Sequence, residues 1–107
     1  MSEDWICQNA KIERIGYFFC GHYNAGCIRV QIAVAGGGHC NFELTPRQVG
    51  KFLTAIDRVR EDGEYIEELE GTPFCAWFAH NGHGKIVAVS SILDQRGDEM
   101  YELEGAK

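Results

Sequence analysis

Apolar side chains recur at every second position over residues 27–35, and this pattern is typical of a strand with one buried face. Residues 11–20, rich in Ile, Tyr and Phe, predict a strand before it, and residues 39–44 predict a third strand after it. We therefore expect three consecutive strands joined by short turns. The inward face of the middle strand would carry Ile28, Val30, Ile32 and Val34.

Helical spacing begins after residue 44. Thr45 can cap a helix, Pro46 suits the first helical position, and Gln48 completes a capping box. We expect this helix to end near residues 61–63, and residues 64–70 suit a short second helix with Tyr65, Ile66 and Leu69 inward. The apolar stripe of the main helix would be formed by Val49, Phe52, Leu53, Ile56 and Val59.

Two further strands are predicted over residues 72–79 and 85–93, with a hairpin turn at 80–84. The last strand is apolar on both faces, which is typical of a central strand or of an edge covered by a partner. Strict alternation would place Val87, Val89 and Leu93 on one face and Ile86, Ala88 and Ile92 on the other.

The predicted element order is β-β-β-α-β-β, which favours an α+β fold. We expect an antiparallel sheet of about five strands with one main helix packed on one face. A chain of 107 residues, of which 45% are hydrophobic, suits a single domain with one core. Within this domain (residues 1–107), we expect 1–10 to be a lead-in, 11–94 the core and 95–107 a polar tail.

The formal net charge is −6, from 16 acidic and 10 basic side chains. Repulsion from phosphates disfavours non-specific nucleic-acid binding, so we expect no direct nucleic-acid partner. The chain has no apolar stretch long enough to span a membrane, and residues 1–5 lack the basic start of a secretory signal. Five irregularly spaced cysteines do not indicate a disulfide framework. These features predict a cytoplasmic protein with no membrane partner.

Acidic residues are concentrated in residues 61–70. A dense carboxylate patch can meet a basic partner surface and steer its approach. The same pattern is also typical of a solvated surface helix. The partner-binding residues predicted on this basis are Glu61, Asp62, Glu64, Glu67, Glu68 and Glu70.

Three consecutive glycines separate the second and third predicted strands. They predict a hairpin turn, because glycine adopts turn conformations easily, and they match neither a P-loop nor a G-x-G-x-x-G turn that opens into a helix. An alternative is that this turn, with the Gly- and His-rich segments 21–26 and 80–84, binds a small nucleotide-like anion. The residues of that ligand site would be Gly36, Gly37, Gly38, His39, Arg29, Arg47 and Lys51.

A metal site is a further alternative, built on the loop histidines. Zinc needs three or four ligands in a tetrahedral arrangement, and the chain has no CxxC or HExxH spacing. A cysteine nucleophile needs a histidine within reach, but the neighbours His39 and Cys40 would point to opposite faces of a strand. We therefore expect a protein that is not an enzyme and has no cofactor. The histidines of the metal alternative are His22, His39, His80 and His83.

Five short landmarks follow one another over residues 11–95. They are an I-x-x-I strand, a Gly-rich turn with an aromatic residue soon after it, a helix carrying Phe-Leu, an L-x-G turn and a G-K-I-x-A-x-x-x-I-L-x-D strand. The residues concerned are Ile12, Ile15, Gly36, Phe42, Phe52, Leu53, Leu69, Gly71, Gly84, Lys85, Ile86, Ala88, Ile92, Leu93 and Asp94.

This order of landmarks resembles a widespread family of small phage-encoded proteins with no assigned function. The chain departs from the family pattern at Ser90-Ser91, where Gly-His is common, and it lacks the tryptophan that often follows the final Asp. The resemblance implies an origin and an architecture, and no functional residues are carried over from the family.

Together these observations predict a small non-enzymatic binding protein of phage or mobile-element type. Its expected activity is to inhibit a host defence protein by occupying it through the acidic segment. The alternatives are a nucleotide-like small-molecule binder or sponge that uses the Gly- and His-rich loops, and a small zinc-binding domain. Exposed strand edges also allow a homo-oligomer.

Overall fold

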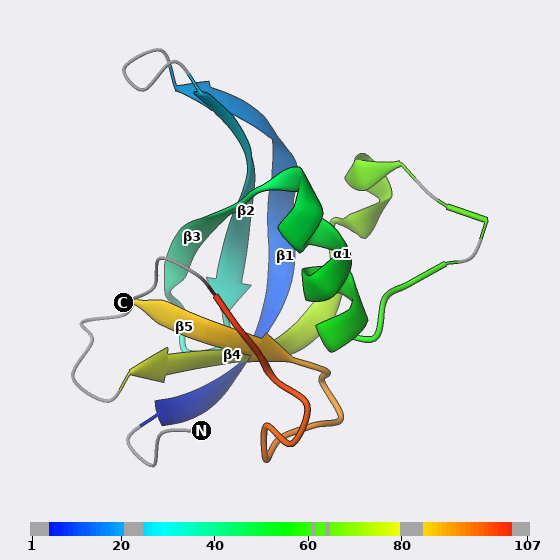
Figure 1. Cartoon of the computed structure of the whole chain (residues 1–107). Helices are drawn as coiled ribbons and strands as arrows, with labels where there is room; N and C mark the ends of the chain where they lie inside the picture. The colour runs from blue at the N-terminus through cyan, green and yellow to red at the C-terminus, as the bar shows by residue number, and fades with distance from the viewer. Residues whose placement is uncertain (1–4, 21–24, 61, 64, 80–84, 104–107) are drawn as a thin grey trace.

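Six strands form one antiparallel sheet in the computed structural model, in the order β3-β2-β1-β4-β5-β6 (Figure 1). The structure describes residues 5–20, 25–60, 62–63, 65–79 and 85–103. Within these residues the fold is α+β with one main helix, as predicted, and the sheet has six strands where about five were expected. The elements are β1 (Trp5–Cys20), β2 (Ala25–Val34), β3 (His39–Leu44), α1 (Pro46–Ala55), the 3₁₀ helix η1 (Ile66–Leu69), β4 (Pro73–Ala79), β5 (Ile86–Ser90) and β6 (Tyr101–Glu102).

Strand β1 begins at Trp5 and not at residue 11. Its first part, as far as Lys11, pairs with β4, and from Ala10 onward it pairs with β2. Residues 5–10 are therefore strand and not a lead-in. The strand that pairs with them lies far away in the sequence, so no local pattern revealed this extension.

A β-bulge in β1 explains how two apolar residues three positions apart both reach the core. The pairing with β2 shifts between Ile12 and Arg14, which leaves Glu13 as an extra residue. In an uninterrupted strand, Ile12 and Ile15 would face opposite sides of the sheet. With the bulge, their exposed fractions are only 1% and 3%.

A second bulge changes the predicted faces of β5. The pairing with β4 shifts between Trp77 and Phe78, and Val87 is the extra residue. The strict alternation expected over residues 85–93 is therefore wrong. The main core contains Ile86 and Val89, and the opposite face of the sheet carries Val87 and Ala88.

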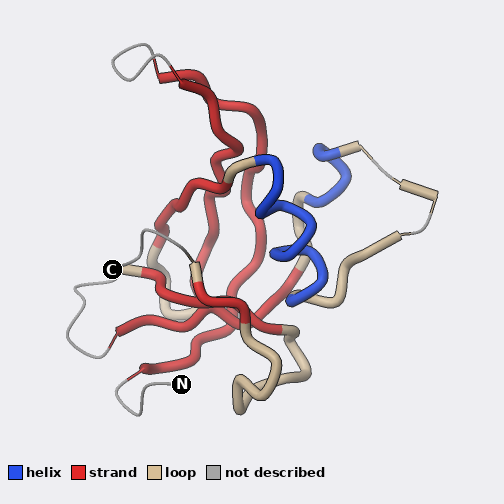
Figure 2. The backbone as a smooth tube through the Cα atoms, viewed as in Figure 1, coloured by secondary structure: helices blue, strands red, loops and turns tan. Residues whose placement is uncertain are grey.

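Helix α1 covers one face of the sheet (Figures 1 and 2). It begins as predicted, because Thr45 Oγ1 accepts a hydrogen bond from the Gln48 N–H at 3.3 Å and Gln48 Oε1 accepts one from the Thr45 N–H at 2.8 Å. Its buried side carries Phe52 and Ile56. In the described part of the chain, no helix has the length and apolar character needed to cross a membrane.

The end of α1 comes earlier than predicted, because Asp57 adopts a left-handed conformation with φ of 59°. The N–H groups of Asp57 and Arg58 donate to the carbonyls of Thr54 (3.1 Å) and Leu53 (2.9 Å), which is the Schellman arrangement of a helix C-terminus. The chain then leaves the helix axis. Val59 consequently falls outside the apolar stripe and is 62% exposed.

The predicted second helix is only the short 3₁₀ helix η1. Leu69 is buried and Ile66 is half-buried, as expected. Tyr65 was expected to point inward, but it precedes η1 and is 77% exposed.

The main core lies between α1 and the sheet. Phe52 packs edge-to-face against Phe42 of β3 and Phe74 of β4, with ring centroids 5.6 and 5.9 Å apart. A smaller cluster around Trp77 lies on the other face of the sheet and includes Met100. The segment after β5 therefore covers the β4–β5 part of the sheet from its second side.

The C-terminal segment also belongs to the domain, although a polar tail was expected over residues 95–107. Strand β6 pairs with Ala88 and Val89 of β5. Leu103 is only 6% exposed and joins the main core. One apolar anchor and a short strand therefore attach this acidic segment to the sheet.

Candidate functional site

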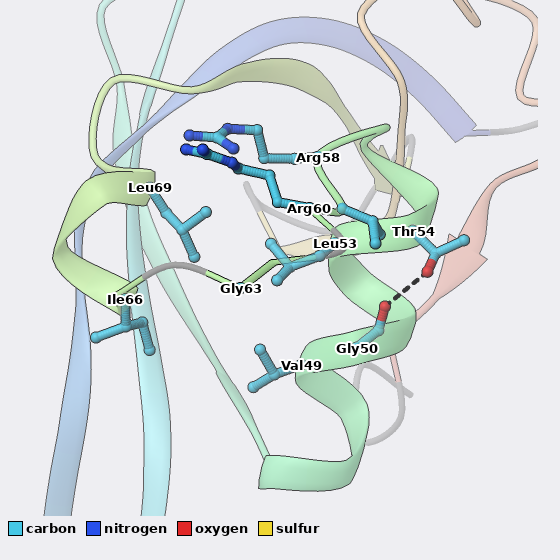
Figure 3. Close-up of a pocket in the computed structure, with 10 residues that line it drawn as sticks. Val49, Gly50, Leu53, Thr54, Arg58, Arg60, Gly63, Ile66 and Leu69 are labelled. Atoms are coloured by element: carbon cyan, nitrogen blue, oxygen red, sulfur yellow. Dashed lines mark hydrogen bonds between the residues drawn. The ribbon is translucent and has the colours of Figure 1, made fainter.

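An apolar groove with a volume of about 410 Å³ opens between α1 and η1 (Figure 3). Aliphatic side chains from both elements lie around it, and its lining is completed by Gly50, Thr54, Arg58, Val59, Arg60 and Gly63. These aliphatic residues are Val49 and Leu53 from α1 and Ile66 and Leu69 from η1.

The α1 wall exists because the apolar stripe of the helix is wider than the face that the sheet covers. Phe52 and Ile56 are buried, whereas Val49 and Leu53 are only half-buried. A Cβ placed on Gly50 would meet nothing within 4 Å. This part of the helix therefore leaves apolar surface free to bind a partner.

The η1 wall is anchored to the sheet. Leu69 is 2% exposed and packs in the main core. After η1, the Gly71 N–H donates to the Ile12 carbonyl at 2.7 Å, and the Ile12 N–H donates to the Thr72 carbonyl at 2.9 Å. Gly71 has φ of 88°, which favours glycine at this turn. These bonds hold η1 beside β1 and away from α1, which keeps the groove open.

Two arginines follow α1 at one end of the groove. The side chains of Arg58 and Arg60 extend in the same direction, toward Leu69 (Figure 3). Arg60 Nε lies 3.7 Å from Asp62 Oδ1, and both side chains are at least half exposed, so this ion pair is weak. The groove thus combines apolar walls with a charged rim.

Four of the six predicted partner-binding carboxylates lie in the described part of the chain, and all are exposed: Asp62, Glu67, Glu68 and Glu70. Glu61 and Glu64 lie outside the described residues. Two of the four belong to η1 itself. Glu67 and Glu68 therefore belong to the element that forms one wall of the apolar groove, although neither side chain lines the groove itself.

The glycine tract forms a closed turn between β2 and β3. The Gly37 N–H donates to the Val34 carbonyl at 2.9 Å, and the Val34 N–H donates to the Gly38 carbonyl at 2.8 Å. Gly37 has φ of 96°, which favours glycine. Gly36 makes neither of these two hydrogen bonds within the described turn. A Cβ at Gly36 would lie 3.5 Å from Gln8 Oε1.

The three Gly- and His-rich loops do not attach to one end of the β1–β2 ladder. The ladder runs from the pair Ala10 and Val34, beside the glycine turn, to the pair Cys20 and Ala25. The segment 21–24 therefore joins the end of the ladder opposite to the glycine turn. Residues 21–24 and 80–84 themselves lie outside the described residues.

The cations of the ligand alternative lie on different faces of the molecule. Arg29 faces away from α1, where its Nη2 lies 2.6 Å from Glu43 Oε2 and its guanidinium carbon lies 3.7 Å from the centroid of the Phe18 ring. Arg47 and Lys51 are exposed on α1. The structure therefore does not bring Arg29 together with Arg47 and Lys51.

Of the four histidines of the metal alternative, the structure describes His39. Its Nδ1 lies 3.3 Å from Glu13 Oε1. His22, His80 and His83 lie outside the described residues. Within the described ranges, no group of three or more His, Cys, Asp or Glu side chains is placed to hold a metal ion.

The cysteine environments favour protonated thiols. Burial, helped by a hydrogen bond to Cys75 and by the charges of Cys75 and Asp94, raises the pKa of Cys7 to about 12. Burial also raises the pKa of Cys40. A nucleophilic cysteine reacts as the thiolate, so neither site is tuned for nucleophilic attack at neutral pH.

The sequence does not identify the groove-lining residues, because the apolar stripe of α1 predicts that all of its members pack in the core. The stripe itself carried a signal, since Val49, Phe52, Leu53 and Ile56 together cover a wide part of the helix surface. The position of η1 carried no signal, because its contact with β1 depends on residues far apart in the sequence.

Comparison with known proteins found no matching protein-family model, no matching curated protein and no matching solved structure. The groove and its charged rim are the features from which a function can be argued.

Proposed function

We propose that the protein is a small non-enzymatic binding protein of phage or mobile-element type, which inhibits a host defence protein by occupying it. The contact surface is the groove between α1 and η1 together with the exposed carboxylates of the acidic segment. One observation carries the proposal: the open apolar groove (Figure 3) is bounded by η1, the element that also carries the exposed residues Glu67 and Glu68. The family resemblance of the sequence landmarks is the basis for the proposed origin.

The partner that fits this surface presents an apolar side chain flanked by lysine or arginine. Burial of one Leu- or Phe-sized side chain in the groove contributes about 1.5–3 kcal/mol. The charged side chains that line the groove are Arg58 and Arg60, whereas the four described carboxylates of the acidic segment are exposed outside its lining. Because these four negative charges outnumber the two positive ones, the surface around the groove attracts a basic flank. Such surface charges mainly raise the association rate and the specificity, and salt weakens their effect.

Charge reversal of the acidic segment tests the proposal. A variant with Glu67→Lys, Glu68→Lys and Glu70→Lys should capture at least about tenfold less of its protein partner from host-cell extract, because a positive surface repels a basic flank. The partner is identified and quantified by mass spectrometry. The matched control is Asp98→Lys, Glu99→Lys and Glu102→Lys, which changes the net charge equally at exposed sites and should capture the partner normally.

A second variant tests the apolar part of the groove without changing any charge. Gly50→Leu adds a side chain where a Cβ meets nothing within 4 Å, and it favours the helix by roughly 0.5–1 kcal/mol. Lost capture would then reflect a filled groove and not unfolding. Normal capture of the partner by both the charge-reversal variant and Gly50→Leu would exclude this surface. An equal loss of capture in the control variant would show that the effect comes from the net charge alone.

A further inference from the structure

The hairpin formed by β1 and β2 projects beyond the rest of the sheet (Figure 1). Strand β4 pairs with β1 only as far as Lys11, and β3 pairs with β2 only between Ile28 and Ala33. The last residues of β1 are therefore paired with β2 alone. We call residues 16–20 the β1 arm.

The β1 arm has an open edge on the side away from β2. On that side, the backbone of Ile12 is bonded to Gly71 and Thr72. Beyond it, from Arg14 to Cys20, no strand in the described part of the chain pairs with this edge. Unpaired N–H and C=O groups along a strand edge are a template for pairing with another chain.

The sequence of this edge does not protect it from such pairing. Proteins usually blunt an exposed edge with charged residues or proline, but residues 15–19 read Ile-Gly-Tyr-Phe-Phe. Tyr17 and Phe19 are 69% and 56% exposed, and they face the same side because they are two residues apart. Two exposed aromatic side chains beside an open strand edge indicate an interface.

We propose that the β1 arm pairs with the β1 arm of a second copy of this chain, antiparallel and about a two-fold axis through Phe18. In this register, Tyr17 lies opposite Phe19 of the second copy on the same face. The segment is self-complementary, because Tyr17, Phe18 and Phe19 each lie opposite an aromatic residue when a second copy runs in the opposite direction. Such cross-strand aromatic pairs add stability beyond that of the backbone hydrogen bonds.

Charge also favours a second copy at this place. Each copy carries a net charge of −6, but residues 15–19 are uncharged. The Arg29 guanidinium that lies over the Phe18 ring is paired with Glu43, so two copies approach here with little repulsion. The interface is small, because stable interfaces bury about 1,200–2,000 Å² and a short strand pair buries less. The dimer is therefore reversible and depends on protein concentration.

Sedimentation velocity of the full chain over a wide concentration range tests this pairing. The wild type should show a monomer–dimer equilibrium, and the double variant Tyr17→Lys with Phe19→Lys should raise the dimer dissociation constant at least about tenfold. The matched control is Tyr65→Lys with Leu93→Lys, at side chains that are 77% and 87% exposed. It carries the same change in charge and should dimerise as the wild type does.

Hydrogen exchange of the wild-type chain tests the backbone pairing directly. Amides within residues 15–19 should become more protected as the protein concentration rises, and those of η1 should not. A wild-type chain that is monomeric at every concentration, or a dimer that survives the arm variant, would overturn the proposal. Protection of these amides only in host-cell extract would assign the edge to another protein and would also overturn it.

Discussion

Ser90 links two strands and the segment that follows them. It is completely buried, and its Oγ accepts a hydrogen bond from Trp77 Nε1 and donates one to the Asp94 carbonyl, both at 2.9 Å. The Asp94 carboxylate in turn accepts bonds from the N–H groups of Asp98 and Glu99. The Ser90 hydroxyl therefore connects β4, β5 and the segment after β5 through hydrogen bonds.

Replacement of this hydroxyl should weaken the fold. Ser90→Ala leaves the buried Trp77 indole without its acceptor and should lower the free energy of unfolding by about 1–3 kcal/mol, measured by urea denaturation. The matched control is Ser91→Ala, because Ser91 is only half-buried and its Oγ accepts from the Leu93 N–H at 3.2 Å. A loss in Ser90→Ala no larger than in this control would contradict the structural role.

The elements of this fold owe their boundaries to different causes. The start of α1 depends on Thr45 and Gln48, which are three residues apart, so the sequence predicted it correctly. The end of α1 depends on the left-handed conformation of Asp57. Asp adopts this conformation less readily than glycine, so the glycine at position 63 was the stronger end signal in the sequence.

The helix end gives a prediction for Asp57. Asp57→Gly should raise the free energy of unfolding by up to about 1 kcal/mol, because glycine adopts positive φ without strain, whereas Asp57→Val should lower it by about 1 kcal/mol or more. Thermal and denaturant unfolding measure both changes. Asp98→Gly is the control, because Asp98 is an exposed aspartate without a positive φ, and it should not gain stability. A destabilising Asp57→Gly would contradict the proposed helix end.

The whole molecule is a sheet centred on β1, with different cover on its two faces. Helix α1 covers one face of the sheet (Figure 1), where Phe52 packs with its aromatic partners, and Met100 of the segment after β5 packs against the Trp77 cluster on the other face. Leu103 returns to the main core at the end of that segment. We therefore expect the C-terminal segment, as far as Leu103, to unfold together with the domain.

A comparison of two leucines tests this view of the C-terminal segment. Leu103→Ala should lower the free energy of unfolding by about 2–5 kcal/mol, because Leu103 is 6% exposed, whereas Leu93→Ala should change it by less than about 0.5 kcal/mol, because Leu93 is 87% exposed. Both are measured by denaturant unfolding, followed by tryptophan fluorescence and circular dichroism together. Similar small effects of both substitutions would show that the segment is a loosely attached tail.

The candidate site was only half predictable from the sequence. The acidic residues around Glu67 and Glu68 formed a visible charge cluster, because charge density is a property of the sequence itself. The groove beside them needs Leu53 of α1 and Ile66 of η1 on opposite walls. That arrangement depends on how η1 attaches to β1 through Gly71, and no local pattern contains this information.

The sequence by itself determined the α+β class, the central parts of β2, β3 and β4 and the start of α1. These features depend on side-chain alternation and capping between near neighbours, which the chain order specifies. Only the tertiary structure decided the extension of β1 to Trp5, the sixth strand at Tyr101–Glu102 and the bulges at Glu13 and Val87. Each of these features depends on the register with a partner strand, which no local sequence pattern contains, so the hydrogen bonds that stabilise it form only when the sheet is assembled.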